Sequence, residues 1–184
     1  MTGWRAQFED ALRVLARVSM TMDEAGHRPP ILVGGAAVEI YTQGQIATGD
    51  FDLICGRQDL LEEVFARFGF ERPSGPGKST RGWIHPALGM GFEVVSDTLL
   101  GGLADRAMVR VLELGEDGAV AIIAPEDIIA DRMGQYASGS APEMLGQARA
   151  LYALCEGLDT AYMERRISEE TAGSHGLQDL ADEA

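Results

Sequence analysis

The chain has 184 residues, of which 46% are hydrophobic and 24% are charged, and its formal net charge at pH 7 is −14. This length suffices for one domain with a hydrophobic core, with room for a small helical appendix. No apolar run approaches the roughly 20 residues that a membrane span requires, so we expect no membrane segment. The negative charge argues against broad electrostatic binding of DNA. The N-terminal residues lack the basic-then-apolar layout of a signal peptide, which predicts a cytoplasmic protein.

The first predicted elements are a helix, a strand and a second helix. Apolar side chains recur every three or four residues over 4–24, which is typical of an amphipathic helix. Residues 31–33 form a short apolar run, as in a buried strand, and the run stops at Gly34 and Gly35. Residues 36–41 then favour a helix. A glycine pair at this junction leaves free backbone N–H groups at a helix N-terminus, where an anion can bind.

The next predicted strand carries two acidic side chains. Residues 48–54 read Thr-Gly-Asp-Phe-Asp-Leu-Ile. Because side chains alternate along a strand, Asp50 and Asp52 share one face while Phe51 lies on the other. Two carboxylates so close together are either fully solvated or hold a divalent cation between them. The pattern by itself leaves both possibilities open.

A predicted helix over residues 58–68 is followed by a loop over residues 72–81, which contains Lys78 and Arg81. The loop holds two prolines and two glycines. Its basic side chains could close over a triphosphate or an acceptor. The alternative is an ordinary solvated surface loop.

Two hairpins are predicted after this loop. The first joins residues 83–85 to residues 90–95. In its second strand, Glu93 lies between two apolar residues and therefore points away from their face. The second hairpin joins residues 108–114 to residues 119–124 through a glycine-rich acidic turn.

The predicted strands end before Pro125, and a helical region begins there. Proline is well suited to the first position of a helix. Two more helices follow, and from Thr171 the composition is polar and small. We therefore predict an α/β (α+β) domain over residues 1–124, in which helices flank a small mixed sheet. A C-terminal helical region follows over residues 125–170. The last segment, 171–184, is an acidic tail whose composition favours disorder.

The glycine pair, the acidic strand and the later glutamate together resemble the nucleotidyltransferase superfamily that includes DNA polymerase beta. Within it, they are most similar to the minimal nucleotidyltransferase-fold proteins of bacterial abortive-infection and toxin–antitoxin systems. The resemblance covers about residues 30–158. It implies transfer of a nucleotidyl group from a nucleoside triphosphate to a hydroxyl of RNA or of a protein. It also implies a cognate antitoxin or another protein as a partner.

The resemblance assigns roles to particular residues. Asp50, Asp52 and Glu93 would be the catalytic metal ligands, holding Mg²⁺ (or Mn²⁺), because these ions prefer oxygen ligands. Two such ions, about 3.5 to 4 Å apart, can stabilise the attacking and leaving oxygens of phosphoryl chemistry. The nucleotide-binding residues that the resemblance implies are Gly34, Gly35, Thr48, Lys78, Arg81 and Arg132.

Two positions depart from the family pattern. Related proteins usually carry an arginine two residues before the threonine of the acidic strand, and here that position is Ile46. They usually carry a lysine on the helix after Pro125, where the nearest basic residue here is Arg132. Both departures weaken phosphate binding through the basic side chains that related proteins carry at these positions. They favour an alternative, a catalytically inactive nucleotidyltransferase-fold module that acts by binding a protein partner.

Overall fold

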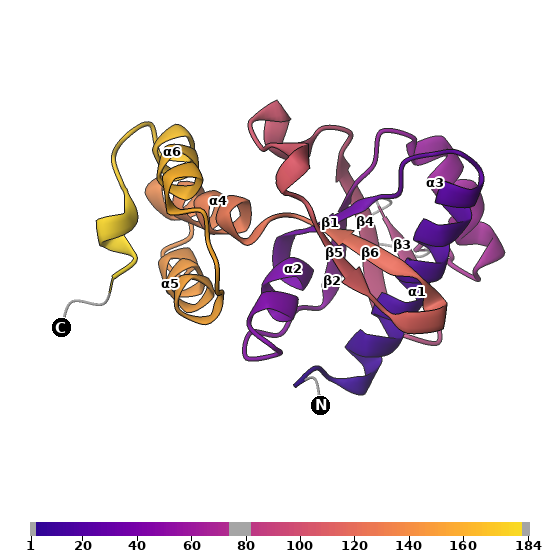
Figure 1. The fold of residues 1–184 in the computed structure, drawn as a ribbon. Coiled ribbons are helices and arrows are strands. Elements are labelled where there is room, and N and C mark those ends of the chain that lie inside the picture. Colours follow the sequence, from indigo (N-terminus) through magenta and orange to yellow (C-terminus); the bar gives the residue numbers. More distant parts are fainter. Residues whose placement is uncertain (1–2, 74–81, 182–184) are drawn as a thin grey trace.

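The computed structural model describes residues 3–73 and 82–181, and it contains a six-stranded mixed sheet in the order β3-β4-β2-β1-β6-β5 (Figure 1). Strand β1 is antiparallel to β2 and parallel to β6, and β2 is parallel to β4. The sheet therefore confirms the predicted mixed α/β fold. The strands are β1 (Ile31–Val33), β2 (Asp50–Ile54), β3 (Trp83–His85), β4 (Met90–Ser96), β5 (Arg110–Glu113) and β6 (Ala119–Ile122).

Helices cover both faces of this sheet. In Figure 1, α1 and α3 lie on one side, whereas α2 and the C-terminal helices lie on the other. The α-helices are α1 (Ala6–Glu24), α2 (Gly34–Tyr41), α3 (Gln58–Arg67), α4 (Pro125–Ala137), α5 (Met144–Leu154) and α6 (Thr160–Glu170). Short 3₁₀ helices are η1 (Leu99–Gly102), η2 (Arg106–Met108), η3 (Gly115–Asp117) and η4 (Leu177–Asp179).

An aromatic cluster fills the layer between the sheet and helices α1 and α3. Phe51 on β2 and Phe92 on β4 are register partners, and their ring centroids lie 4.6 Å apart. Phe8 of α1 packs 5.2 Å from Phe51, and Phe65 of α3 meets Phe92 at 6.0 Å. Burial of these rings fixes which way the two strands face. The side chains between them, including Asp52, must therefore point to the opposite face.

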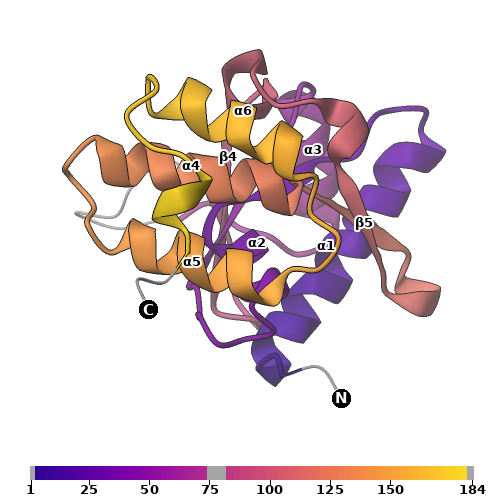
Figure 2. The same ribbon diagram turned by 60° about the vertical axis from the view of Figure 1, so that its left-hand side comes forward.

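The three C-terminal helices pack side by side (Figure 2), and a buried ion pair joins two of them. Arg166 of α6 is fully buried, and its Nε donates to the Asp127 carboxylate of α4 at 2.7 Å. The Tyr162 hydroxyl also donates to Asp127, at 2.9 Å. Burial raises the pKa of Asp127, although Arg166 and Tyr162 act in the opposite direction. This network holds the first turn of α4 against α6.

The segment after α6 is folded over residues 171–181, whereas its composition favours disorder. Leu180 is only 2% exposed and belongs to the hydrophobic core. Arg149 of α5 donates to the Asp179 carbonyl at 3.0 Å, and Thr171 is buried. Two apolar side chains, Leu177 and Leu180, and a few polar contacts thus tether a segment that is otherwise polar. Within the described residues, no helix combines the length and the apolar character needed to cross a membrane.

Candidate active site

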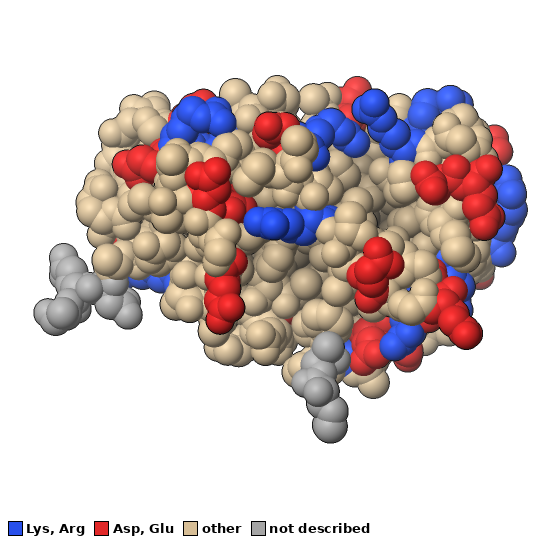
Figure 3. Space-filling model, viewed as in Figure 1, with Lys and Arg blue, Asp and Glu red and all other residues tan. Residues whose placement is uncertain are grey.

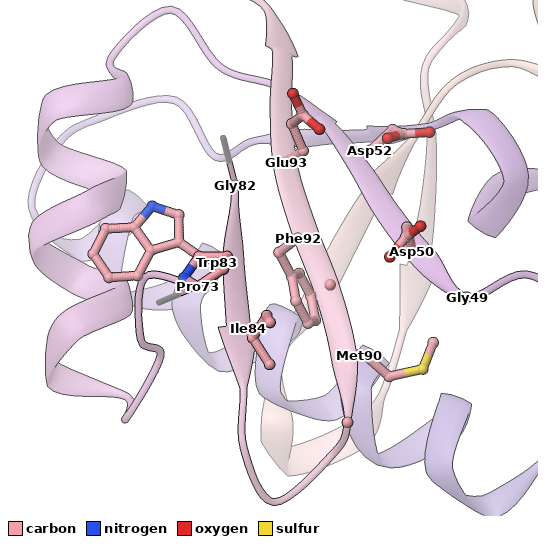
Figure 4. A pocket seen from close by; sticks show the side chains of 12 residues that line it. Gly49, Asp50, Asp52, Pro73, Gly82, Trp83, Ile84, Met90, Phe92 and Glu93 are labelled. Carbon is pink, nitrogen blue, oxygen red and sulfur yellow. The ribbon is translucent and has the colours of Figure 1, made fainter. Parts of the chain in front are cut away.

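The structure brings the three predicted acidic side chains together on one face of the sheet. Asp50 and Asp52 lie on β2, and Glu93 lies on β4. Asp52 and Glu93 are register partners on these parallel strands, while Asp50 lies opposite Gly91. Figure 4 shows the three carboxylates on the same side of the two strands. Two segments far apart in the sequence thus supply one acidic site.

The surroundings of Asp52 disfavour its ionised form. Burial raises its pKa above the ordinary value, and the nearby carboxylates of Asp50 and Glu93 raise it further. Arg132 partly opposes this effect. A divalent cation beside these groups would remove the repulsion and favour the ionised form.

Glycines make room for these carboxylates. Gly34 has a left-handed backbone with φ of +62°, and a β-carbon at this position would overlap the Asp52 carboxylate. A β-carbon at Gly91 would overlap the Asp50 carboxylate in the same way. At Gly35 it would lie 2.5 Å from Thr48 Oγ1. The glycine pair therefore lets the end of β1 and the start of α2 approach the acidic strand closely.

Asp52 lies between two pockets and lines both. We call the first the hairpin pocket; it has a volume of about 450 Å³ and is bordered by the β3–β4 hairpin (Figure 4). We call the second the α4 pocket; it has a volume of about 370 Å³ and lies between the sheet and α4. Both volumes are in the range of small-molecule sites. The hairpin pocket is lined chiefly by Asp50, Asp52, Trp83, Ile84, Met90, Phe92 and Glu93. The α4 pocket is lined chiefly by Gly34, Asp52, Ser96, Thr98, Leu100, Asp131, Arg132 and Gln135.

Arg132 gives the α4 pocket a buried positive charge. The residue is 6% exposed, and its Nη1 pairs with the Asp131 carboxylate at 2.9 Å. Its Nε has no hydrogen-bond partner among the described residues. Burial raises the pKa of Asp131, while Arg132 and a hydrogen bond from Gln135 lower it. A buried guanidinium at the wall of a pocket is suited to binding an anion such as phosphate.

The other predicted residues fall into two groups. Thr48 lies at the entry to β2, beside Gly35, and its Oγ1 lies 3.3 Å from the Asp50 carbonyl oxygen. Thr48 does not line either of the two pockets. Lys78 and Arg81 lie outside the described residues, so their predicted role over a triphosphate stays a prediction.

Sequence reasoning missed the residues that support this site. Arg5 and Glu39 contact Thr48, and Asp131 and Gln135 share the α4 pocket with Arg132. A glutamate within the apolar helix α2 was the one signal that could have identified Glu39, because an acid among buried residues requires a partner.

The three carboxylates provide a suitable donor set for magnesium. Among the described residues, no three His, Cys, Asp or Glu side chains are arranged to hold one ion as they stand. Three features nevertheless fit a hard divalent cation. The donors are all oxygens, the pKa of Asp52 is raised, and Gly34 and Gly91 leave space beside the carboxylates.

Comparisons with known proteins agree with this geometry at the level of the fold. No protein-family model matches the sequence, and no curated protein matches it either. The crystal structure of an antigenic nucleotidyltransferase-like protein from Paracoccidioides brasiliensis is similar, with a TM-score of 0.58 and 14% sequence identity. The similarity covers 95% of this chain and 91% of that chain. The chain therefore has the fold of a nucleotidyltransferase-like protein.

Proposed function

We propose that this protein is a Mg²⁺-dependent nucleotidyltransferase that moves a nucleotidyl group from a nucleoside triphosphate to a hydroxyl of RNA or of a protein. The observation that carries this proposal is the position of Asp52 between two pockets, one of which contains the buried Arg132. Group transfer requires a donor and an acceptor on either side of the reacting phosphorus. The two pockets supply two such places beside one acidic site.

The donor triphosphate fits the α4 pocket better than the hairpin pocket. Arg132 is the buried cation there, and a planar guanidinium can donate to phosphate oxygens. Gly34 lines the same pocket at the N-terminus of α2, where a helix favours negative charge. These groups would bind and orient the phosphates next to Asp52.

The acceptor hydroxyl would enter through the hairpin pocket, beside Asp50 and Glu93. These carboxylates, with Asp52, would hold Mg²⁺ or Mn²⁺, which when bound stabilises charge on the attacking and leaving oxygens. Trp83, Ile84 and Met90 give the pocket an apolar wall. On the face shown in Figure 3, acidic and basic side chains are interspersed, without a continuous basic surface. The net charge of −14 makes an extended RNA footprint hard to accommodate, so a small RNA or a protein segment is the favoured acceptor.

The direct test is a transfer assay with each of the four α-³²P-labelled ribonucleoside triphosphates, Mg²⁺, and RNA and protein fractions as acceptors. We expect covalent label in one fraction, and its loss in Asp50→Asn/Asp52→Asn. Asp10→Asn is the matched control, because Asp10 is an exposed aspartate of α1 away from the site. Label that persists in the double variant would contradict the proposal.

The alternative function is an inactive nucleotidyltransferase-fold module that acts through a protein partner. Ile46 favours it, as does the fact that no three potential ligands among the described residues are arranged for one ion as they stand. Such a module would transfer no label with any acceptor and would act through its protein partner instead. A role in a toxin–antitoxin pair, a cognate antitoxin and a cytoplasmic location stay predictions from the sequence.

A further inference from the structure

We infer that Arg5 and Glu39 act as positioning residues that fix the entry of the acidic strand, and thereby place Asp50. This inference rests on the proposed function. Neither residue belongs to β2, and neither lines the hairpin pocket or the α4 pocket. Their effect on the site would act through the backbone of Thr48.

Glu39 is a fully buried carboxylate on α2 with two partners. Arg5, which directly precedes α1, donates to it from Nε at 3.2 Å and from Nη2 at 3.0 Å. The backbone N–H of Thr48 donates to Glu39 Oε2 at 2.6 Å. Two charge-assisted contacts from one guanidinium fix the orientation of the carboxylate.

Arg5 also contacts the second polar group of the Thr48 backbone, its carbonyl oxygen. Its Nη2 donates to the Thr48 carbonyl oxygen at 2.6 Å. Both the N–H and the C=O of Thr48 are thus held by the same ion pair. We call this arrangement, Arg5, Glu39 and the Thr48 backbone, the entry clamp.

Besides the entry clamp, the stretch of chain before β2 is held by the Thr42 hydroxyl, which accepts from the Ile46 N–H at 3.3 Å, and by packing of Ile46 against the core. Apart from the sheet ladder, no backbone–backbone hydrogen bond of the described chain involves residues 46–48. Gly49 follows, and the space around its Cα is open. Asp50, the exposed first residue of β2, comes next. Loss of the clamp would therefore displace Asp50 most, whereas Asp52 and the buried remainder of β2 stay in the sheet.

The test compares Arg5→Lys with Arg13→Lys. Lysine keeps the charge, yet it cannot make the forked contacts to Glu39 and Thr48. Arg13 is the matched control, because it lies on α1, is 41% exposed against 44% for Arg5, and pairs with Glu9 and Asp117. We expect kcat of Arg5→Lys to fall roughly 10- to 100-fold, with KM for the triphosphate within about twofold of the wild type. Arg13→Lys should retain wild-type values.

Mn²⁺ binding without nucleotide provides a readout that does not need turnover. We expect Arg5→Lys to bind Mn²⁺ about tenfold more weakly than the wild type, because Asp50 is displaced. Glu39→Gln, which removes the charge and keeps the shape, should show the same loss of Mn²⁺ affinity. It replaces Arg5→Lys in the test if Arg5→Lys does not fold. Mn²⁺ affinity of both folded variants within about twofold of the wild type would overturn the entry clamp. A wild type that binds Mn²⁺ and transfers no label would contradict the proposed function instead.

Discussion

Gly34 and Asp52 approach each other so closely that a β-carbon on the glycine would overlap the carboxylate of the aspartate. The contact joins the start of α2 to the middle of the acidic strand, and both residues line the α4 pocket. A residue at the strand-to-helix junction is thus directly coupled to the acid that lies between the two pockets.

The first prediction compares Gly34→Ala with Gly26→Ala. Both glycines have positive φ, +62° and +77°, so each substitution should cost about 1 to 2 kcal/mol of unfolding free energy. Gly26 has open space around it, whereas Gly34 faces Asp52. Gly34→Ala should therefore lose about 1 to 3 kcal/mol more, through steric overlap, and should also lose transfer activity. Urea denaturation and the transfer assay measure the two effects. Equal stability losses in the two variants would show that the contact with Asp52 is unimportant.

The second prediction concerns pH in the absence of metal. Burial and the neighbouring acids raise the pKa of Asp52 above 3.8, so the native state holds this proton more tightly than the unfolded chain does. Its contribution to stability is therefore full below pH 3.8 and is lost as pH rises through the folded pKa. Asp52→Asn should be the more stable protein near neutral pH, and its advantage should shrink on acidification. Unfolding midpoints measured from pH 4 upward, without and with Mg²⁺, test this.

Added Mg²⁺ should reverse the order of the two proteins at neutral pH. The cation binds the ionised carboxylates of the wild type and stabilises it by about 2.7 kcal/mol at 100 times its dissociation constant. Asp52→Asn should gain less. If the wild type and the variant respond identically to pH and to Mg²⁺, Asp52 is a solvated surface acid.

The third prediction concerns Arg132 in the α4 pocket. Arg132→Lys should weaken triphosphate binding about tenfold, because the planar, forked donor set of the guanidinium is lost while the charge remains. Arg165→Lys is the control, because Arg165 pairs with Glu169 at 3.1 Å on α6 and does not line the pocket. Titration with a fluorescent nucleotide analogue gives both dissociation constants. An unchanged constant for Arg132→Lys would place the phosphates elsewhere.

The fourth prediction concerns the buried ion pair of the C-terminal helices. Arg166→Met leaves the Asp127 carboxylate buried without its partner, so we expect a loss of about 3 to 5 kcal/mol of unfolding free energy. Replacing Asp127 as well, in Asp127→Leu/Arg166→Met, should recover part of that loss, because Glu169 and Glu170 still lose their contacts with Arg166. Arg165→Met, at an exposed neighbouring position, should change stability by less than about 0.5 kcal/mol. Denaturant unfolding followed by circular dichroism distinguishes these outcomes.

Local patterns in the sequence were sufficient for most of the secondary structure. The alternation of Asp50, Phe51 and Asp52 predicted which side chains share a face, and the aromatic cluster around Phe51 confirms it. Pro125 begins a helix as expected, and the hairpin that carries Glu93 forms. These features depend on residues close together in the chain, so a short window of sequence contains them.

The remaining features depend on contacts that a short window does not contain. Arg165 and Arg166 are adjacent and chemically identical, yet one side chain is 56% exposed and the other is fully buried. Only the packing of α6 on α4 distinguishes them. The pairing of Arg5 with Glu39 and the position of Asp52 between two pockets likewise require the order of the strands, which helix and strand periodicity do not determine.

The most direct measurement for the central claim is isothermal titration of a non-hydrolysable nucleoside triphosphate analogue, with and without Mg²⁺. It compares the wild type, Asp50→Asn/Asp52→Asn and the control Asp10→Asn. We predict binding that requires Mg²⁺, is lost in the double variant and is unchanged in Asp10→Asn. Binding that is equally strong in the double variant, or no binding to the folded wild type at millimolar analogue, would contradict the assignment of this acidic site to nucleotide chemistry.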